Sequence, residues 1–241
     1  MRSSNPTLRT DTFDSAEVIP GSNPMTLQGT IQKSFILLVL AITVSAISWR
    51  LSDSLGGLLI PVGAFGGFVT ALILCFKKTW APALAPAYAI FEGLFLGTLS
   101  AFYERAYGGI VGQAVMLTFG TFFALLAAYQ TRLIRPSENF KLGIFAATGG
   151  IALVYLATMV LGIFGIQIPY IHGSGIIGIG FSLLVVTIAA LNLVLDFDFI
   201  EQGAEQRAPK YMEWYAAFGL LVTLVWLYIE FLRLLSKLRQ R

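Results

Sequence analysis

The sequence predicts an all-α polytopic membrane protein with seven transmembrane helices, and three observations lead to this fold class. Of its 241 residues, 56% are hydrophobic and only 12% are charged, whereas soluble proteins carry about 25% charged residues. The charged residues are clustered, and the runs between the clusters are long and apolar enough to cross a bilayer. A soluble protein would need polar faces along its helices, which these runs lack.

The apolar runs define the predicted spans in chain order. They cover residues 34–49, 58–76, 80–103, 110–129, 142–164, 176–199 and 214–235. A Ser-Asp-Ser segment followed by Gly56 and Gly57 predicts a tight turn between the first two spans. In the third span, Gly93 and Gly97 form a small-xxx-small pattern, which indicates close packing between helices. Together the spans predict one transmembrane domain over residues 31–241.

The N-terminal segment and the basic residues predict how the chain lies in the membrane. Residues 1–30 are polar and have little periodicity, so we expect a disordered cytoplasmic tail. With the N-terminus inside, the outside loops hold only Arg50 and Arg105, which the positive-inside rule favours. The inside segments hold Arg2, Arg9, Lys33, Lys77, Lys78, Arg132, Arg135, Lys141, Arg207 and Lys210. The basic C-terminal tail does not follow the positive-inside rule, because seven spans place it outside. Either the rule fails there, or one span is re-entrant and the tail returns to the inside.

The rare residue types argue against several function classes. The chain has one cysteine, Cys75, and one histidine, His172, so neither a zinc site nor a Cys-His nucleophile pair is expected. His172 lies in a predicted loop, where it is a weak candidate for sensing pH. No basic stretch is interleaved with aromatic residues as in a nucleic-acid surface. We therefore expect no enzyme, no cofactor and no nucleic-acid partner, and a lipid bilayer as the environment.

Four acidic residues in or beside the predicted spans are the candidate site residues: Glu92, Asp196, Asp198 and Glu230. A carboxylate in a membrane is costly unless it meets water, a partner or an ion, so each is a candidate for ion binding or pH sensing. Asp196 and Asp198 are two residues apart and point about 200° apart on a helix, so at most one faces the bundle interior. Asp196 is the deeper of the two and is the favoured residue.

Each candidate also has a structural interpretation. Glu92 either binds ions or is protonated and hydrogen-bonded between helices, and Asp198 can extend toward the lipid headgroups. Glu230 forms either a local ion pair with Arg233 or part of a functional site. Two neighbouring buried carboxylates cannot both ionise cheaply and can share a proton. Hard cations such as calcium prefer carboxylate oxygens, which makes Asp196 a candidate calcium ligand.

Three segments carry a family resemblance. VLDFDFIEQGAE, Val194 to Glu205, is similar to a sixth-helix motif in which an Asp follows an apolar pair. AIFEGLFLG, Ala89 to Gly97, is similar to a Gly-rich third helix. WLYIEFLRLL, Trp226 to Leu235, is similar to a last helix with an acidic residue in an aliphatic and aromatic run. These segments resemble the transmembrane Bax inhibitor motif family, in particular its bacterial branch, over roughly residues 30 to 238.

The resemblance implies a seven-helix fold with a central last helix, and a pH-sensitive calcium leak gated by two aspartates on the last two helices. Asp196 matches the sixth-helix aspartate. Glu230 matches the last-helix residue by its motif, although it is a glutamate and the segment between the two acids is longer than in the family. The family's basic latch residue on the second helix has no counterpart, because residues 58–76 contain no Lys or Arg. Glu92 is then a candidate to share the gating role.

Two functional hypotheses follow. The leading one is a pH-sensitive cation leak channel or exchanger, with calcium as the expected ion, gated by protonation of intramembrane carboxylates. The alternative is a non-transporting membrane protein that regulates a partner, such as a membrane protease or a stress-response assembly. The resemblance to the bacterial branch implies location in a bacterial inner (plasma) membrane.

Overall fold

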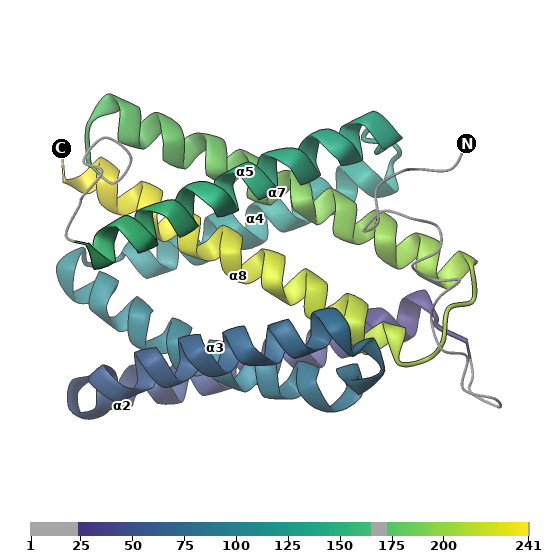
Figure 1. The fold of residues 1–241 in the computed structure, drawn as a ribbon, viewed down its shortest axis with the longest axis horizontal. Helices are drawn as coiled ribbons and strands as arrows, with labels where there is room; N and C mark the ends of the chain where they lie inside the picture. Colours follow the sequence, from purple (N-terminus) through teal and green to yellow (C-terminus); the bar gives the residue numbers. More distant parts are fainter. Residues whose placement is uncertain (1–23, 165–172, 241) are drawn as a thin grey trace. The chain divides into compact units, whose positions relative to one another are not determined.

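The computed structural model describes residues 24–164 and 173–240, and its named elements are all helices (Figure 1). They are α2 (Leu27–Phe76), the 3-10 helix η1 (Lys78–Trp80), α3 (Ala81–Ala106), α4 (Ile110–Gln130), α5 (Glu138–Ile163), α7 (Ile176–Glu205) and α8 (Met212–Arg239). Six helical segments of the described chain are long and apolar enough to cross a membrane. The all-α membrane fold is therefore confirmed, whereas the count of seven spans is not. The predicted spans 34–49 and 58–76 both lie within α2.

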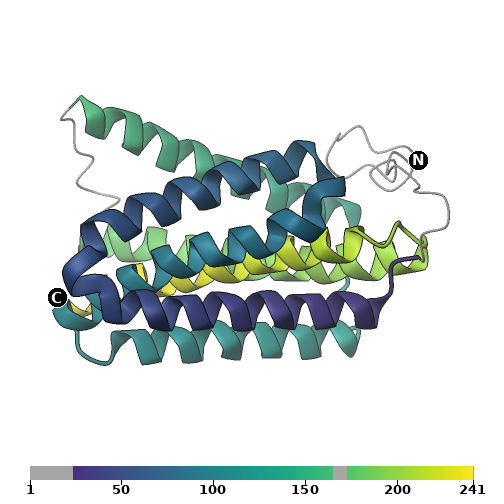
Figure 2. The ribbon, with the colours of Figure 1, turned by 90° about the horizontal axis from the view of Figure 1, so that it is seen from below.

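Helix α2 nevertheless turns back on itself, because its two halves pack against the same part of α3. Gly93 of α3 lies against the carbonyl oxygen of Ala41, where a Cβ atom would come within 2.8 Å. Gly63, 22 residues further along α2, lies against the backbone of Phe91 and Phe95. A straight helix would separate Ala41 and Gly63 by about 33 Å. Figure 2 shows the purple and blue halves of α2 as two arms joined by a sharp turn.

The N-terminal tail predicted over residues 1–30 lies largely outside the described residues, which begin at Pro24. From there the chain is held in place. The backbone N–H of Met25 donates to the carbonyl oxygen of Ala208 at 2.6 Å. Thr26 is the N-cap of α2, and its hydroxyl accepts from the backbone N–H of Gly29 at 3.0 Å, which satisfies one of the free donors of the first helical turn. His172 also lies outside the described residues.

The chain divides into two compact units. Unit 1 comprises Met1–Leu99 and Asp198–Leu221, and unit 2 comprises Ser100–Phe197 and Val222–Arg241. Helices α3, α7 and α8 contribute residues to both units. In unit 2, α7 packs on its neighbours through an edge-on contact between Phe197 and Phe122 of α4 and through a hydrogen bond from Asn192 to Thr148 of α5.

Burial differs strongly among the candidate spans. In the most apolar stretch of α8, 61% of the residues are buried, whereas the corresponding values are 17% for α4 and 11% for α5. Large apolar side chains such as Phe123, Leu153 and Met159 are more than half exposed. Exposed apolar surface on this scale is unfavourable in water and requires a lipid environment. The last helix is thus the most buried span, and α4 and α5 present apolar surface to the bilayer.

Candidate functional site

Asp196 lies in unit 2 within the long apolar helix α7, nine residues before the helix ends at Glu205. Nine residues correspond to about 14 Å along a helix, so the carboxylate lies well inside the candidate span. One oxygen is engaged by the side chain of Thr223 on α8. The other, Oδ2, is buried and has no hydrogen-bond partner. An acceptor in this position can take up a proton or contact a cation.

Glu230 is also in unit 2 and its side chain is completely buried on α8. Its Oε1 atom accepts hydrogen bonds from the hydroxyl of Tyr155 at 2.9 Å and from the guanidinium of Arg233 at 2.7 Å. The ion pair with Arg233 that the sequence spacing allowed is therefore present. Its Oε2 atom is buried without a partner. Glu230 is thus both neutralised by a local cation and left with one vacant acceptor.

Asp196 and Glu230 do not form a carboxylate pair in the described part of the chain. Asp196 bonds to Thr223, whereas Glu230 bonds to Tyr155 and Arg233. Thr223 and Glu230 are seven residues apart on α8, which is two helical turns or about 10 Å. The longer segment between the two acids therefore places them at different levels, as the departure from the family pattern suggested.

Glu92 lies in unit 1 on α3, next to Gly67 of α2. A Cβ atom at Gly67 would come within 2.9 Å of the carboxylate atom Oε1, so a larger residue there would displace the end of the Glu92 side chain. Tyr88, one turn earlier on α3, is hydrogen-bonded to Glu92. The Oε2 atom is buried without a partner. The contacts of the Glu92 carboxylate are thus with neutral groups, namely the hydroxyl of Tyr88 and the backbone of α2 at Gly67.

Asp198 has a different environment from Asp196, as expected from their positions on the helix. It belongs to unit 1 and accepts a hydrogen bond from Gln202 one turn further along α7. Its oxygens are not among the buried atoms that lack a partner. Of the two aspartates, only Asp196 has a buried, vacant oxygen.

A fifth acidic residue, Glu213, was missed by the sequence analysis. It lies in the first turn of α8 in unit 1 and its side chain is completely buried. Its oxygens accept from the backbone N–H and hydroxyl of Thr26, both at 2.9 Å, from Lys210 at 2.8 Å, and from Lys33. The one available sequence signal was the i,i+3 spacing from Lys210 to Glu213. Glu213 fastens the start of α2 to the start of α8 and has no vacant oxygen.

The acidic residues do not form a metal-binding cluster. Among the residues that the structure describes, no group of three or more His, Cys, Asp or Glu side chains is arranged to hold a metal ion. A tightly held calcium ion normally has six to eight oxygen ligands. Asp196, predicted as a calcium ligand, is therefore not part of such a cluster. A single carboxylate suits brief contact with a cation better than tight binding.

The family model described as Bax inhibitor 1 like matches residues 5–240, which is nearly the whole chain. No curated protein matches the chain.

Proposed function

Since the chain belongs to the Bax inhibitor 1 like family, a family of membrane proteins with apolar helices, we propose that it is a cation leak channel or exchanger gated by protonation of intramembrane carboxylates, with calcium as the transported ion. The observation that carries the proposal is Asp196, a buried carboxylate within an apolar candidate span whose Oδ2 atom has no partner. A charge held at such a depth without a cationic partner is expensive, so the group either carries a proton or has a cation beside it.

Glu92 supports the same proposal from unit 1. It too lies within a candidate span, and it too has one buried oxygen without a partner. Its contacts with Tyr88 and Gly67 are neutral, so no neighbouring cation compensates its charge. Each of the two carboxylates can exchange a proton for a cation, which is the elementary step of a carboxylate-controlled leak. Glu230 is a weaker candidate, because Arg233 already neutralises it.

The topology completes the proposal. We place the two arms of α2 across the membrane separately, because each arm packs against the same part of α3, and this gives seven crossings in total. The ten basic residues of the inside segments favour a cytoplasmic N-terminus. The resemblance to the bacterial branch supports location in a bacterial inner membrane. The mechanism requires no catalytic residue and no bound cofactor.

The test is calcium flux into liposomes that contain the purified protein, measured between about pH 6 and 8. The variants are Asp196→Asn and Glu92→Gln, with Asp198→Asn as the matched control two residues from Asp196. We expect pH-dependent flux from the natural sequence and from Asp198→Asn, and an altered pH dependence from Asp196→Asn. Equal flux from protein-containing and empty liposomes at every pH would exclude a leak and leave the non-transporting regulator of a membrane partner as the function to test.

A further inference from the structure

Residues 24–33, the first part of the described chain, lie across the start of α8 in unit 1, and we call them the strap. Pro24 and Pro209 form an isolated antiparallel β-bridge. Beside this bridge, the backbone N–H of Met25 donates to the carbonyl oxygen of Ala208 at 2.6 Å. The side chain of Met25 is buried. Backbone pairing thus docks the strap on the connection between α7 and α8.

The strap and the start of α8 share the carboxylate of Glu213. From the strap, the backbone N–H and the hydroxyl of Thr26 both donate to it at 2.9 Å, and Lys33 forms an ion pair with it. Lys210, three residues before Glu213, forms a second ion pair at 2.8 Å. A Cβ atom at Gly29 would collide with the carboxylate, so the backbone of the strap lies directly against it.

These contacts allow the strap to leave without leaving a buried charge unpaired. Glu213 is completely buried, and a buried carboxylate without a partner is costly. Lys210 belongs to the connection before α8, so it stays beside Glu213 when the strap lifts off. The side chain of Lys33 is 16% exposed and that of Lys210 is 44% exposed, so water reaches both. The second cation therefore lowers the free-energy cost of undocking the strap.

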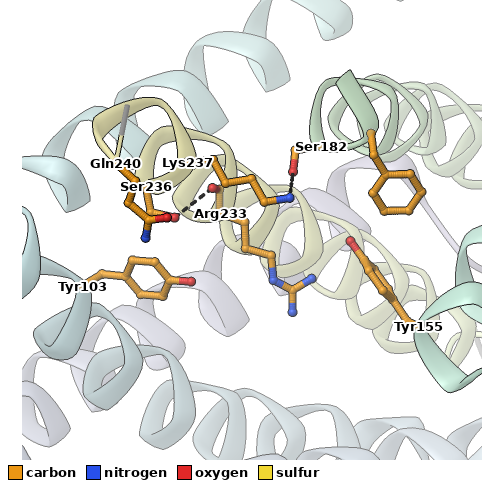
Figure 3. A pocket seen from close by; sticks show the side chains of 8 residues that line it. Tyr103, Tyr155, Ser182, Arg233, Ser236, Lys237 and Gln240 are labelled. Atoms are coloured by element: carbon orange, nitrogen blue, oxygen red, sulfur yellow. Dashed lines mark hydrogen bonds between the residues drawn. The ribbon is translucent and has the colours of Figure 1, made fainter. Parts of the chain in front are cut away.

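The opposite end of α8 is fixed independently of the strap. Lys237 donates to the carbonyl oxygen of Gly178 and to the hydroxyl of Ser182, both on α7. Figure 3 shows the ammonium of Lys237 directed toward Ser182. Arg239 donates to the carbonyl oxygen of Gly108 at 2.7 Å. These contacts lie in unit 2, so release of the strap loosens the start of α8 and leaves its end in place.

The start of α8 contacts the surroundings of a candidate carboxylate within unit 1. Phe218 lies five residues after Glu213 on α8, about 7.5 Å along the helix. Its ring packs edge-on against Tyr88 of α3, with the ring centroids 4.8 Å apart. Tyr88 is in turn hydrogen-bonded to Glu92. A continuous series of contacts therefore leads from the strap to Glu92, and all of its members belong to unit 1.

We propose that residues 24–33 are a reversible strap that restrains the cation leak. The docked strap holds the start of α8 in place and thereby keeps Phe218 against Tyr88. When the strap is released, Phe218 moves and the hydroxyl of Tyr88 leaves Glu92, so both carboxylate oxygens become available to a cation. The inference rests on the proposed leak function, because Glu92 is one of its carboxylates. Docking of the strap is measured separately from flux.

Docking is tested by the distance between two spin labels on the full-length protein. The labels replace Gln28 in the strap and Gln206 after α7, both exposed and in unit 1, and Cys75 is replaced by Ser. Lys33→Gln removes the cation of the strap and should lengthen and broaden the distance distribution. Lys210→Gln is the matched control, because it removes an equal charge from the same carboxylate but keeps the ion pair with Lys33. Equal distributions in the two variants would overturn the proposal.

A second substitution changes no charge and keeps the test decisive if Lys33→Gln does not fold. Gly29→Ala places a methyl group against the Glu213 carboxylate, whose donors limit its rotation. Alanine also favours the helical backbone of α2 at this position. We therefore expect the strap to undock although α2 remains helical. Gly57→Ala is the control, since no described atom lies within 4 Å of its added Cβ. A strap that stays docked in Gly29→Ala would contradict the inference.

Calcium flux into liposomes tests the consequence for the leak. Lys33→Gln and Gly29→Ala should each raise the flux at constant pH by about fivefold, the lower end of the range for coupling between two sites. Tyr88→Phe should also raise the flux, and Lys33→Gln should add nothing in that background, because the hydroxyl through which the strap acts is absent.

The outcomes separate the strap from the leak itself. If the strap undocks in Lys33→Gln but the flux is unchanged, or if Lys33→Gln raises the flux equally with and without Tyr88→Phe, the strap does not restrain the leak through Tyr88. No flux from the natural sequence at any pH, combined with a strap that undocks in Lys33→Gln, would refute the leak and leave the reversible docking of the strap intact.

Discussion

Units 1 and 2 each bury one glutamate of α8 completely, yet the two residues are compensated to different degrees. Glu213 in unit 1 receives four donors, including two lysines, on both of its oxygens. Glu230 in unit 2 receives two donors, both on Oε1, and its Oε2 atom has none. The comparison teaches that burial alone does not identify a functional carboxylate. The number and charge of the donors distinguish an acid that holds helices together from one that remains chemically available.

Removing the fully compensated acid should have the largest effect. In Glu213→Gln the two lysines lose their shared anion, and the start of α2 loses a charged acceptor. Breaking a buried ion pair from one side costs about 3–5 kcal/mol, and we expect the lower end because Lys33 and Lys210 are partly exposed. Thermal unfolding of the detergent-purified protein would measure this. Glu205→Gln, at an exposed position on α7, is the control. Equal Tm values for the two variants would show that Glu213 does not stabilise the contact between the starts of α2 and α8.

The partly compensated acid should contribute less. Glu230→Gln keeps an acceptor for Tyr155 and Arg233, and the 43% exposure of Arg233 lets water solvate the guanidinium. We expect a loss of about 1.5–2 kcal/mol in the free energy of unfolding, the low end of the range for a hydrogen bond to a charged group. Glu138 forms an i,i+3 pair with Lys141 at the surface, so Glu138→Gln is a matched control that should cost about 0–1 kcal/mol. If Glu230→Gln were less stable than Glu213→Gln, the number and charge of the donors would not determine how much each glutamate stabilises the protein.

The smallest effect should come from displacing the carboxylate that has only neutral contacts. Gly67→Ala places a methyl group against Oε1 of Glu92, and the flexible end of that side chain can rotate away at a cost of about 1 kcal/mol. Gly57→Ala on the same helix is the control, since no atom lies within 4 Å of its added Cβ, and it should be neutral or slightly stabilising. The readouts are the Tm and the pH dependence of calcium flux. If Gly67→Ala and Gly57→Ala gave the same result in both, Glu92 would not depend on the space left by Gly67.

The sequence predicted those features that depend on neighbouring residues of one helix. The i,i+3 spacing allowed the Glu230–Arg233 pair, and the angular separation of Asp196 and Asp198 predicted their different environments. The prediction of two spans within α2 is not confirmed, because Ser and Gly around residues 52–57 favour a turn but are also compatible with helical backbone, and the structure assigns one helix over Leu27–Phe76. The Glu213 cluster could not be found, since Thr26 and Glu213 are 187 residues apart and no spacing rule links them.

That separation also fixes an order of events during synthesis. Thr26 and Lys33 are made with the first helix, but their carboxylate partner Glu213 follows 187 and 180 residues later, respectively. At about 5–20 residues per second, the wait is about 10–40 s. Throughout that interval the beginning of α2 has an uncompensated lysine beside the membrane. The contacts that fasten the start of α2 to the start of α8 in unit 1 can therefore form only after Glu213 has left the ribosome.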